Sequence, residues 1–373
     1  MKHRSILGAL LAALAVALVG AQSVFADPGN GNGKVVFVQT NELSGNRVLV
    51  YDRGQSGQLT PAGSYATGGN GGAAAPGTES DRLASQGSLA YAPAHQTLIA
   101  VNAGSDTVSA FRVQGDTLTL LNVVPSGGQF PNSIGVHDGI AYVLNAGGTG
   151  TVQGFRIGQD GLEPIAGSTR SLGLGNSDPP NFLSAPGQVG FTPDGRWLLV
   201  TTKASTSSVD VFRVQGDLLS ATPIVNPSAT PVPFAFTFGP GGRLVDDEAG
   251  ASSVTTYGIA NDGTLTDPQS QSDGQVALCW IDRVHDFYFV SNTGSNTVSS
   301  FRIGPDGRPE LLAAVAATTN LGTIDLVSSG QFLYVETGLA GTVDEFAVSD
   351  DGTLTSIGSV TGLPPGIQGI AAK

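Results

Sequence analysis

The stretch FVSNTGSNTVSSFRIGPDGRPELL, residues 289–312, decides the fold because the chain repeats its pattern elsewhere. Residues 101–121 read VNAGSDTVSAFRVQGDTLTLL, and residues 335–357 read VETGLAGTVDEFAVSDDGTLTSI. All three share T-V-x-x-F followed by a turn rich in Asp and Gly. A pattern that returns at distant points of one chain is the mark of a repeat architecture.

The aromatic residue that closes the motif V-x-x-[FY] sets the period of the repeat. It occurs seven times, at Tyr51, Phe111, Phe155, Phe212, Tyr257, Phe301 and Phe346. Four of the six intervals are 44 or 45 residues, and the two longer ones, of 60 and 57 residues, contain insertions. The chain is therefore built from seven units of one kind.

Each unit reads as four short β-strands. Apolar runs such as SIGV and QVGF predict a first strand, and runs such as AYVL, WLLV and FLYV predict a second. A turn of Gly, Ser and Asn leads to a third strand that ends in V-x-x-[FY], and a D-G-x-L hairpin leads to a weaker fourth strand. After residue 26 no window shows sustained helical periodicity.

Seven four-stranded units without polar terminal caps predict an all-β fold, a seven-bladed β-propeller, rather than a linear array. The two ends support ring closure. Residues 34–51 match the second and third strands of a unit, while the last residues, GIQGIAAK, match only a first strand. We therefore expect the N-terminal and C-terminal strands to share one blade, and residues 34–373 to form a single domain.

The N-terminus has the pattern of an export signal. Lys2, His3 and Arg4 precede an apolar run over residues 6–19, and SVFA then offers small residues for cleavage. This predicts a signal peptide over residues 1–26, a flexible linker over residues 27–33, and a secreted or periplasmic protein. The apolar run is too short to span a membrane, so no membrane insertion is expected after cleavage.

Charge and cysteine usage narrow the possible partners. Removing Lys2 and Arg4, with no acids in the same segment, takes the net charge from −13 to −15. Nucleic acids and anionic membranes need a basic footprint, so neither is an expected partner, and a monomer is expected. The single thiol, Cys279, cannot form an intrachain disulfide and lies in the apolar run VALCW, which favours a buried, unreactive thiol.

Two insertions and a set of polar residues predict where a ligand would bind. Residues 68–86 and 172–185 both fall between the last strand of one unit and the first strand of the next. Long loops on one face of a rigid ring commonly carry binding sites, although glycine-rich loops also simply tolerate insertion. On the same face, the second strands end in Glu42, Asn102, Asn145, Thr202, Glu248, Asn292 and Glu336.

These strand-end residues have two interpretations. A ring of carboxylates and amides at a channel mouth could bind a polyol or a cation. Alternatively, the side chains hydrogen-bond the tight turn that follows each of them, as Asn and Asp commonly do, and this is favoured for Asn and Thr. Glu248 differs because Asp246 and Asp247 directly precede it, and three adjacent acids are more than one turn needs.

Four segments, TPDGRWLLVT, FGPGGRLVDDEAG, SVTTYGIANDGTL and TVSSFRIGPDG, resemble the seven-bladed propeller lactonase family, which includes 6-phosphogluconolactonase-like and carboxymuconate-cyclase-like enzymes. The repeats also resemble the propellers of surface layers, which are binding or structural modules. The lactonase resemblance covers essentially all of the chain after residue 26. It implies a seven-bladed propeller and hydrolysis of a lactone.

The resemblance also implies a site made of three segments. A His-Pro-His-like segment enters one first strand, a Pro-Arg-His-like segment enters the next, and a glutamate ends the following second strand. Here Ala185 and Gly187 stand at the histidine positions, Phe234 and Ala235 replace the Arg and His, and only Glu248 is retained. Lactone opening needs a base for water and a donor for the oxyanion, so these departures bear directly on activity.

The candidate site follows from that comparison. Glu248 is the candidate catalytic residue, as a general base or a water-orienting carboxylate. The candidate substrate-binding residues are Asn132, Gln188, Ser88, Asn102, Asn145 and Asn292. Asn132 or Gln188 could donate to a carbonyl oxygen. No cofactor and no metal site are predicted, because His95, His137 and His285 lie in separate turns and no phosphate-binding loop, G-x-S-x-G, H-E-x-x-H or C-x-x-C motif occurs.

Three functions therefore remain open from the sequence. The first is an exported lactonase-like hydrolase that acts at the insertion-loop face of the channel. The second is a non-catalytic propeller that binds a glycan, a small metabolite or a protein. The third is an envelope or surface scaffold. A deep polar pocket at Glu248 would favour either of the first two, and a plugged channel would favour the scaffold.

Overall fold

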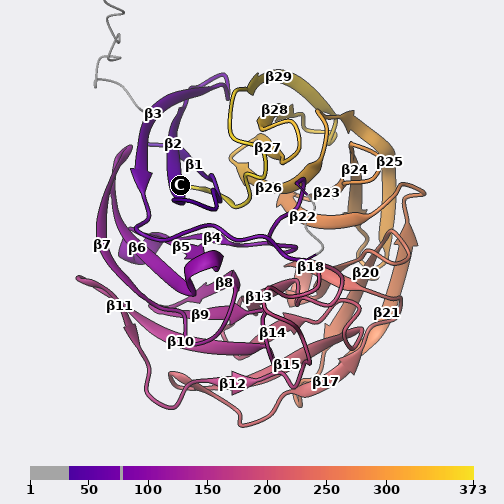
Figure 1. Cartoon of the computed structure of the whole chain (residues 1–373). Coiled ribbons are helices and arrows are strands. Elements are labelled where there is room, and N and C mark those ends of the chain that lie inside the picture. Colours follow the sequence, from indigo (N-terminus) through magenta and orange to yellow (C-terminus); the bar gives the residue numbers. More distant parts are fainter. Residues whose placement is uncertain (1–32, 76–78) are drawn as a thin grey trace, which may run out of the picture. The chain divides into compact units, whose positions relative to one another are not determined.

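The computed structural model describes residues 33–75 and 79–373, so the predicted signal peptide and all but the last residue of the predicted linker lie outside the described residues. Seven antiparallel sheets are arranged in a ring, with their first strands innermost (Figure 1). The predicted fold class, an all-β seven-bladed propeller, is confirmed. We number the blades in chain order, starting from the blade that contains the first strand.

The strands of the blades, from the centre outward, have the following bounds. Blade 1 comprises β30 (Ile370–Ala372), β1 (Val35–Gln39), β2 (Arg47–Arg53) and β3 (Leu59–Ala66). Blade 2 comprises β4 (Leu89–Ala92), β5 (Thr97–Asn102), β6 (Thr107–Gln114) and β7 (Thr117–Pro125). Blade 3 comprises β8 (Pro131–His137), β9 (Ile140–Asn145), β10 (Thr151–Gly158), and an outer strand in two pieces, β11 (Gly161–Pro164) and β12 (Arg170–Ser171).

The remaining blades follow the same plan. Blade 4 comprises β13 (Gln188–Phe191), β14 (Trp197–Thr201), β15 (Ser208–Gln215), and the two outer pieces β16 (Leu218–Leu219) and β17 (Ile224–Pro227). Blade 5 comprises β18 (Pro233–Phe238), β19 (Leu244–Glu248), β20 (Ser253–Ile259) and β21 (Leu265–Ser272). Blade 6 comprises β22 (Leu278–Val284), β23 (Phe287–Asn292), β24 (Thr297–Ile303) and β25 (Pro309–Thr318). Blade 7 comprises β26 (Thr323–Ser329), β27 (Phe332–Thr337), β28 (Thr342–Val348) and β29 (Leu354–Val360).

Both ends of the described chain meet in blade 1. The C-terminal strand β30 pairs antiparallel with β1, with Phe37 opposite Ala371. The shared blade predicted from the two partial units is therefore present, and it joins blade 7 to blade 2 without leaving an open edge in the ring.

The repeat residues form the packing between blades. The seven aromatics that close V-x-x-[FY] are all buried, with exposed fractions from 0 % to 4 %: Tyr51, Phe111, Phe155, Phe212, Tyr257, Phe301 and Phe346. The valines three positions earlier are fully buried: Val48, Val108, Val152, Val209, Val254, Val298 and Val343. Burying one Val and one aromatic per blade removes apolar surface from water in every unit, so the core runs around the ring.

The hairpin glycines explain the second half of the repeated motif. Gly57, Gly263 and Gly352 have φ of 87°, 89° and 85°, a left-handed conformation that favours glycine. A Cβ added to them would lie 2.2, 3.0 and 2.4 Å from the rings of Phe332, Trp197 and Phe287 respectively, each in the preceding blade. Each of these hairpin glycines therefore packs against a large side chain of the preceding blade.

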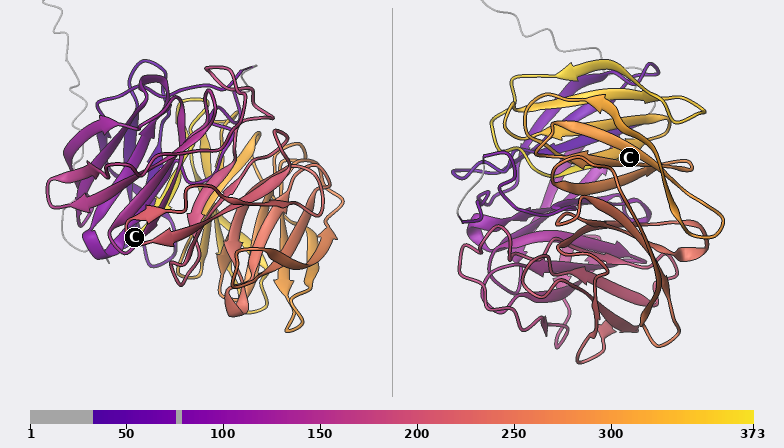
Figure 2. Two further views of the ribbon diagram at one scale, coloured as in Figure 1. Left: turned by 90° about the horizontal axis from the view of Figure 1, so that it is seen from below. Right: turned by 90° about the vertical axis from the view of Figure 1, so that its right-hand side faces the viewer.

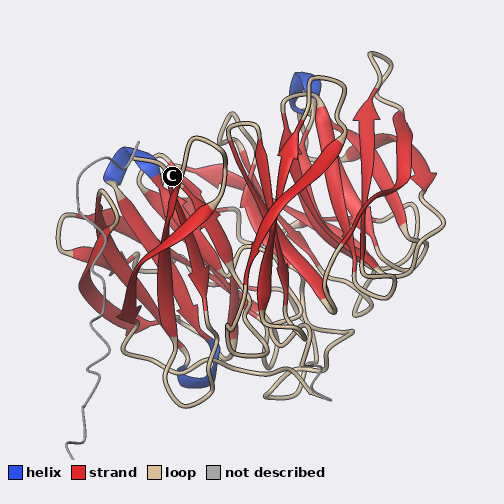
Figure 3. Ribbon diagram, turned by 90° about the horizontal axis from the view of Figure 1, so that it is seen from above, coloured by secondary structure: helices blue, strands red, loops and turns tan. Residues whose placement is uncertain are grey.

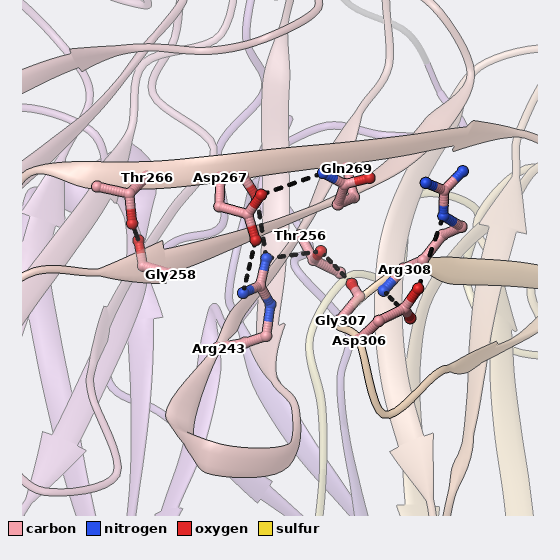
Figure 4. Close-up of polar contacts among 9 residues, drawn as sticks. All are labelled: Arg243, Thr256, Gly258, Thr266, Asp267, Gln269, Asp306, Gly307 and Arg308. Carbon is pink, nitrogen blue, oxygen red and sulfur yellow. Dashed lines mark hydrogen bonds and ion pairs between the residues drawn. The ribbon is translucent and has the colours of Figure 1, made fainter.

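Blades 5 and 6 make the same contact with an arginine in place of a ring. A Cβ on Gly307 would lie 2.5 Å from Nε of Arg243. Figure 4 shows the Arg243 guanidinium reaching Asp267 (3.4 Å) and the Thr256 hydroxyl (3.4 Å), while the Thr256 hydroxyl donates to the Gly307 carbonyl (2.5 Å). The hairpin of blade 6 is thus hydrogen-bonded to blade 5.

The two faces of the ring differ in the loops that they carry. Figure 2 shows the ring edge-on, so that both faces can be seen. One face carries the turns between first and second strands and the hairpins between third and fourth strands. Two of the three short 3-10 turns, η1 (Pro93–His95) and η3 (Pro240–Gly242), lie on this face, which we call the turn face. The third, η2 (Ala103–Ser105), lies on the opposite face with the long loops, which we call the loop face (Figure 3).

Candidate functional site

Glu248 ends β19 on the loop face, and its carboxylate is closed off from solvent. The residue is 0 % exposed. Its Oε2 accepts hydrogen bonds from the Thr230 amide (2.9 Å), the Thr230 hydroxyl (2.5 Å) and the Thr255 hydroxyl (2.7 Å). Its Oε1 accepts a hydrogen bond from the Tyr257 hydroxyl. With four donors from its own blade and the loop before it, the carboxylate fastens residue 230 to β20.

Asp246 and Asp247 are equally buried but have different surroundings. Within the part of the chain that the structure describes, their four carboxylate oxygens have no hydrogen-bond partner. Burial raises the pKa of both carboxyls well above the usual range, and adjacent carboxylates raise it further. Both side chains are thereby driven toward the neutral acid, which leaves Glu248 as the hydrogen-bonded member of the three.

The three strand-end asparagines are turn residues in this structure. Asn102 Nδ2 donates to the hydroxyls of Thr107 (3.1 Å) and Ser109 (2.8 Å). Asn292 makes the matching bonds to the Thr297 (3.3 Å) and Ser299 (2.8 Å) hydroxyls of its own blade. Asn145 Nδ2 donates to the Ser126 carbonyl (3.2 Å) and the Thr151 hydroxyl (3.3 Å). All three are 0 % exposed, so the turn interpretation accounts for their Nδ2 donors.

The other three candidates link inner strands to their neighbours. Asn132 Nδ2 donates to the carbonyls of Pro186 (2.8 Å) and Leu83 (3.4 Å). The Ser88 hydroxyl donates to the Gln368 carbonyl (3.1 Å). The Gln188 amide bonds the backbone of Phe236 in both directions, at 2.7 and 3.2 Å. Of the six predicted substrate-binding residues, these three lie at or next to the inner strands, where their side chains are bonded to other parts of the chain.

Residues 79–88, which we call the plug segment, lie across the mouth of the channel on the loop face. In Figure 1 the loop between β3 and β4 crosses the centre of the ring. The Leu83 amide donates to Oε1 of Gln368 (2.6 Å), just before β30, and the Ser85 hydroxyl donates to the Asn132 carbonyl (2.7 Å) in β8. Leu83 and Ser85 are 0 % exposed.

The plug segment is also bonded to the far side of the ring. The Gln86 side chain pairs with the backbone of Ile281 in β22, donating to its carbonyl (2.9 Å) and accepting from its amide (3.1 Å). The Trp280 indole donates to the Ser85 carbonyl (2.9 Å), and the Gln86 amide donates to the Gly187 carbonyl (3.0 Å). These bonds join blades 1, 3 and 6 to residues that precede blade 2, so the segment closes the channel mouth and ties the ring together.

A buried ammonium sits under this segment. Lys203 Nζ donates to the carbonyls of Ala84 (2.7 Å) and Phe182 (2.8 Å) and lies 4.7 Å from the centre of the Phe234 ring. Burial lowers the pKa of Lys203 to about 8, although the Asp81 carboxylate opposes the shift. Burial likewise raises the pKa of Asp81 to about 6, opposed by Lys203. Each of the two charges therefore favours the ionised form of the other, and the Lys203 ammonium joins residues 84 and 182 beneath the plug segment.

The residues that replace the histidine and arginine of the lactonase pattern lie in tightly packed surroundings. A Cβ on Gly187 would lie 2.3 Å from the Phe234 carbonyl oxygen and 3.0 Å from the Thr201 hydroxyl, so no larger side chain fits without a backbone shift. The Phe234 ring, 2 % exposed, packs edge-on against Trp280 with centroids 4.8 Å apart. The positions that resemble the histidine and arginine positions of the family are filled by packing.

Sequence reasoning missed the residues that close the mouth. Lys203, Asp81 and Gln368 were not among the predicted site residues, yet they hold residues 81–85 in place. One signal was available: lysine is so scarce after residue 26 that only Lys34, Lys203 and Lys373 occur. A lone lysine at a strand end on the loop face could have been singled out.

Two general searches give negative results for residues 33–75 and 79–373. No group of three or more His, Cys, Asp or Glu side chains is placed to hold a metal ion there. In the same residues, no helix is long and apolar enough to cross a membrane.

The chain folds as a seven-bladed propeller, and the comparisons support its resemblance to the propeller lactonase family. The model of the family described as "Lactonase, 7-bladed beta-propeller" matches residues 72–245. The resemblance seen in the sequence is therefore confirmed. The matched region contains the plug segment and ends three residues before Glu248. No protein in a comparison with curated proteins matches the sequence.

Solved structures share the architecture. A protein from Lactobacillus plantarum has a TM-score of 0.72 at 20 % identity, covering 91 % of this chain and 99 % of its own. A proposed 6-phosphogluconolactonase from Bacteroides fragilis has a TM-score of 0.70 at 18 % identity, covering 93 % and 100 %. The periplasmic gluconolactonase PpgL of Pseudomonas aeruginosa has a TM-score of 0.67 at 18 % identity, covering 90 % and 98 %. At these identities the similarity shows the fold alone.

Proposed function

We propose that this chain is an exported propeller of the lactonase fold that serves as an envelope or surface scaffold, the function that a plugged channel favours, and that it does not hydrolyse lactones at its channel mouth. The observation that carries the proposal is the plug segment. Leu83 and Ser85 occupy the place where a ligand would meet the inner strands, and they are 0 % exposed. A substrate that approaches from the loop face must displace this segment, which means breaking its bonds to Gln368, Asn132 and Ile281.

The surroundings of Glu248 support the same proposal. A general base must accept a proton from water within hydrogen-bond reach. Glu248 is fully buried, and four protein donors already surround its carboxylate. No imidazole or guanidinium replaces the groups missing at Gly187 and Phe234, and the nearby Lys203 ammonium already donates to the carbonyls of Ala84 and Phe182 rather than to an oxyanion.

Export is part of the proposal and rests on the sequence. Lys2 and Arg4, the apolar run over residues 6–19 and the small residues at 23–26 have the order of a secretory signal. The periplasmic gluconolactonase with the same fold is compatible with such a location. A rigid ring with a closed mouth suits a scaffold, because its outer faces stay in one arrangement.

Lactone hydrolysis is the second candidate function, and the family-model match over residues 72–245 favours it. A pH-stat assay of the mature protein on five- and six-membered sugar lactones and an aliphatic lactone separates the two, with Glu248→Gln as the matched variant. The proposal predicts no rate above spontaneous hydrolysis for either protein. Turnover by the native protein that collapses in Glu248→Gln would overturn it and establish the hydrolase.

A further inference from the structure

A pocket on the turn face, the face opposite the plug segment, is lined by basic side chains although the chain as a whole is acidic. It has a volume of about 390 Å³ and lies where blade 7 meets blade 1, the point of ring closure. Lys34, Arg53 and His285 line it, together with the amides of Gln55 and Gln331, and no carboxylate does. In a chain of net charge −13 this is a local reversal of sign. We call it the basic pocket.

Arg53 is the buried cation of the basic pocket. The residue is 5 % exposed and ends β2, with its guanidinium carbon 5.0 Å from the centre of the Phe332 ring. It contacts the Tyr334 hydroxyl, whose own proton goes to the Gly57 carbonyl (2.5 Å). Its Nε has no hydrogen-bond partner within the described residues. Because Nε itself is shielded from solvent, the guanidinium can offer a ligand only the nitrogens that border the pocket.

Lys34 stands directly opposite Arg53 in the sheet. The Arg53 amide donates to the Lys34 carbonyl (3.0 Å), and the neighbouring register pairs Val35 with Asp52. Residues directly opposite in an antiparallel pair place their side chains on the same face, and like charges there destabilise the pair. The two cations therefore repel each other unless an anion lies between them.

The nearby acids do not neutralise this pair. Among residues 33–75 and 79–373, neither Lys34 nor Arg53 forms an ion pair. Glu345, whose charge also acts on Tyr334, accepts a hydrogen bond from the Leu59 amide (3.0 Å) instead. Asp286, next to His285, is paired with Arg283 at 3.4 Å. The positive charge of the pocket is left for a ligand.

We propose that the basic pocket binds a small molecule through a phosphate group. A guanidinium fork and an ammonium are the side chains that suit phosphate oxygens, and the amides of Gln55 and Gln331 can donate to the rest of the molecule. The volume exceeds that of one inorganic phosphate and lies in the range of small-ligand sites. The site is on the face opposite Glu248, so it does not depend on whether the channel mouth has activity.

Calorimetric titration of the mature protein tests the proposal, with inorganic phosphate, glycerol 3-phosphate and glycerol as probes. Glycerol 3-phosphate should bind and glycerol should not. Lys34→Gln should weaken binding about tenfold, the loss of one charge-assisted contact, and Arg53→Gln should weaken it at least as much. The control is Arg308→Gln, which removes the same charge from a side chain that is 67 % exposed on the same face and should leave binding unchanged.

Two results would overturn the proposal. One is a native protein that binds neither phosphate probe. The other is a Lys34→Gln protein that binds glycerol 3-phosphate as tightly as Arg308→Gln does, because the effect would then come from net charge alone. Lys34 is exposed and precedes β1, so its variant keeps the test valid even if Arg53→Gln does not fold.

Discussion

Replacing Gly352 by alanine tests whether the repeated hairpin glycine joins one blade to the next. Gly352 has φ of 85°, and an added Cβ would lie 2.4 Å from Cδ1 of Phe287 in blade 6. Phe287 is 4 % exposed, and the Arg302 guanidinium lies 4.9 Å from its ring centre, so the ring has little room to move. The substitution therefore adds a steric clash to a backbone penalty.

A matched control separates the steric part of the expected stability loss from the backbone part. A left-handed conformation costs a non-glycine residue about 1–2 kcal/mol, and forcing an extra carbon into a packed contact costs about 1–3 kcal/mol more. Gly362 has nearly the same φ, 81°, but nothing lies within 4 Å of its added Cβ. We expect Gly352→Ala to destabilise the protein by about 2–5 kcal/mol and Gly362→Ala by only about 1–2 kcal/mol.

Urea denaturation followed by tryptophan fluorescence and by circular dichroism measures both variants. A second variant, Gly352→Ala combined with Phe287→Leu, makes room for the added carbon and should lose less stability than the two single changes together. Equal losses for Gly352→Ala and Gly362→Ala would refute the reasoning, because the contact with Phe287 would then contribute nothing.

Three further predictions concern buried charges and the channel mouth. Lys203→Met should cost about 3–5 kcal/mol at pH 7 by removing a buried positive charge that stabilises the Asp81 carboxylate. The cost should be smaller at pH 5, where Asp81, with a pKa of about 6, takes up a proton. Urea titrations at both pH values check this, and a cost independent of pH would contradict it. Burial raises the pKa of Asp325 to about 8, so the stability from its neutral form is complete near pH 4 and is lost as the pH rises to 8. The free energy of unfolding of Asp325→Asn, relative to that of the native protein, should therefore rise by about 1.4 kcal/mol per pH unit between pH 5 and 8. Thermal denaturation measures this difference, and a difference that stays constant with pH would count against the raised pKa. The Cys279 thiol, buried and with its pKa raised by burial, should react with Ellman's reagent only when urea unfolds the chain, and fast labelling of the native protein would mean that the mouth is open.

The fold was predictable because the repeat encodes it locally. Strands such as β9 and β27 coincide with the apolar runs AYVL and FLYV, and the V-x-x-[FY] aromatics are buried as a repeated core position should be. Ring closure followed from the two partial units at the ends. These features depend on residues within one unit, or on a comparison of units, and both can be read from the sequence.

The candidate site was only partly predictable because its partners are distant in sequence. The bond from Asn102 to Thr107 spans five residues, and the turn interpretation anticipated it. The bond from Leu83 to Gln368 spans 285 residues and has no local signal. The glycine-rich stretch over residues 68–86 lacks periodicity, so the sequence could show an insertion on the loop face but not that part of it would cross the channel.

Hydrogen exchange over residues 79–88 is the most direct test of the closed mouth. The amides of Leu83, Ala84 and Gln86 donate to Gln368, Asp81 and Gly187 respectively, at 2.6, 2.8 and 3.0 Å. Exchange followed by mass spectrometry should therefore show this segment protected to the same degree as the inner strand β4 that follows it. Exchange at the rate of an unstructured peptide would mean that the segment leaves the channel readily, and it would contradict the proposal that this propeller works with its mouth closed.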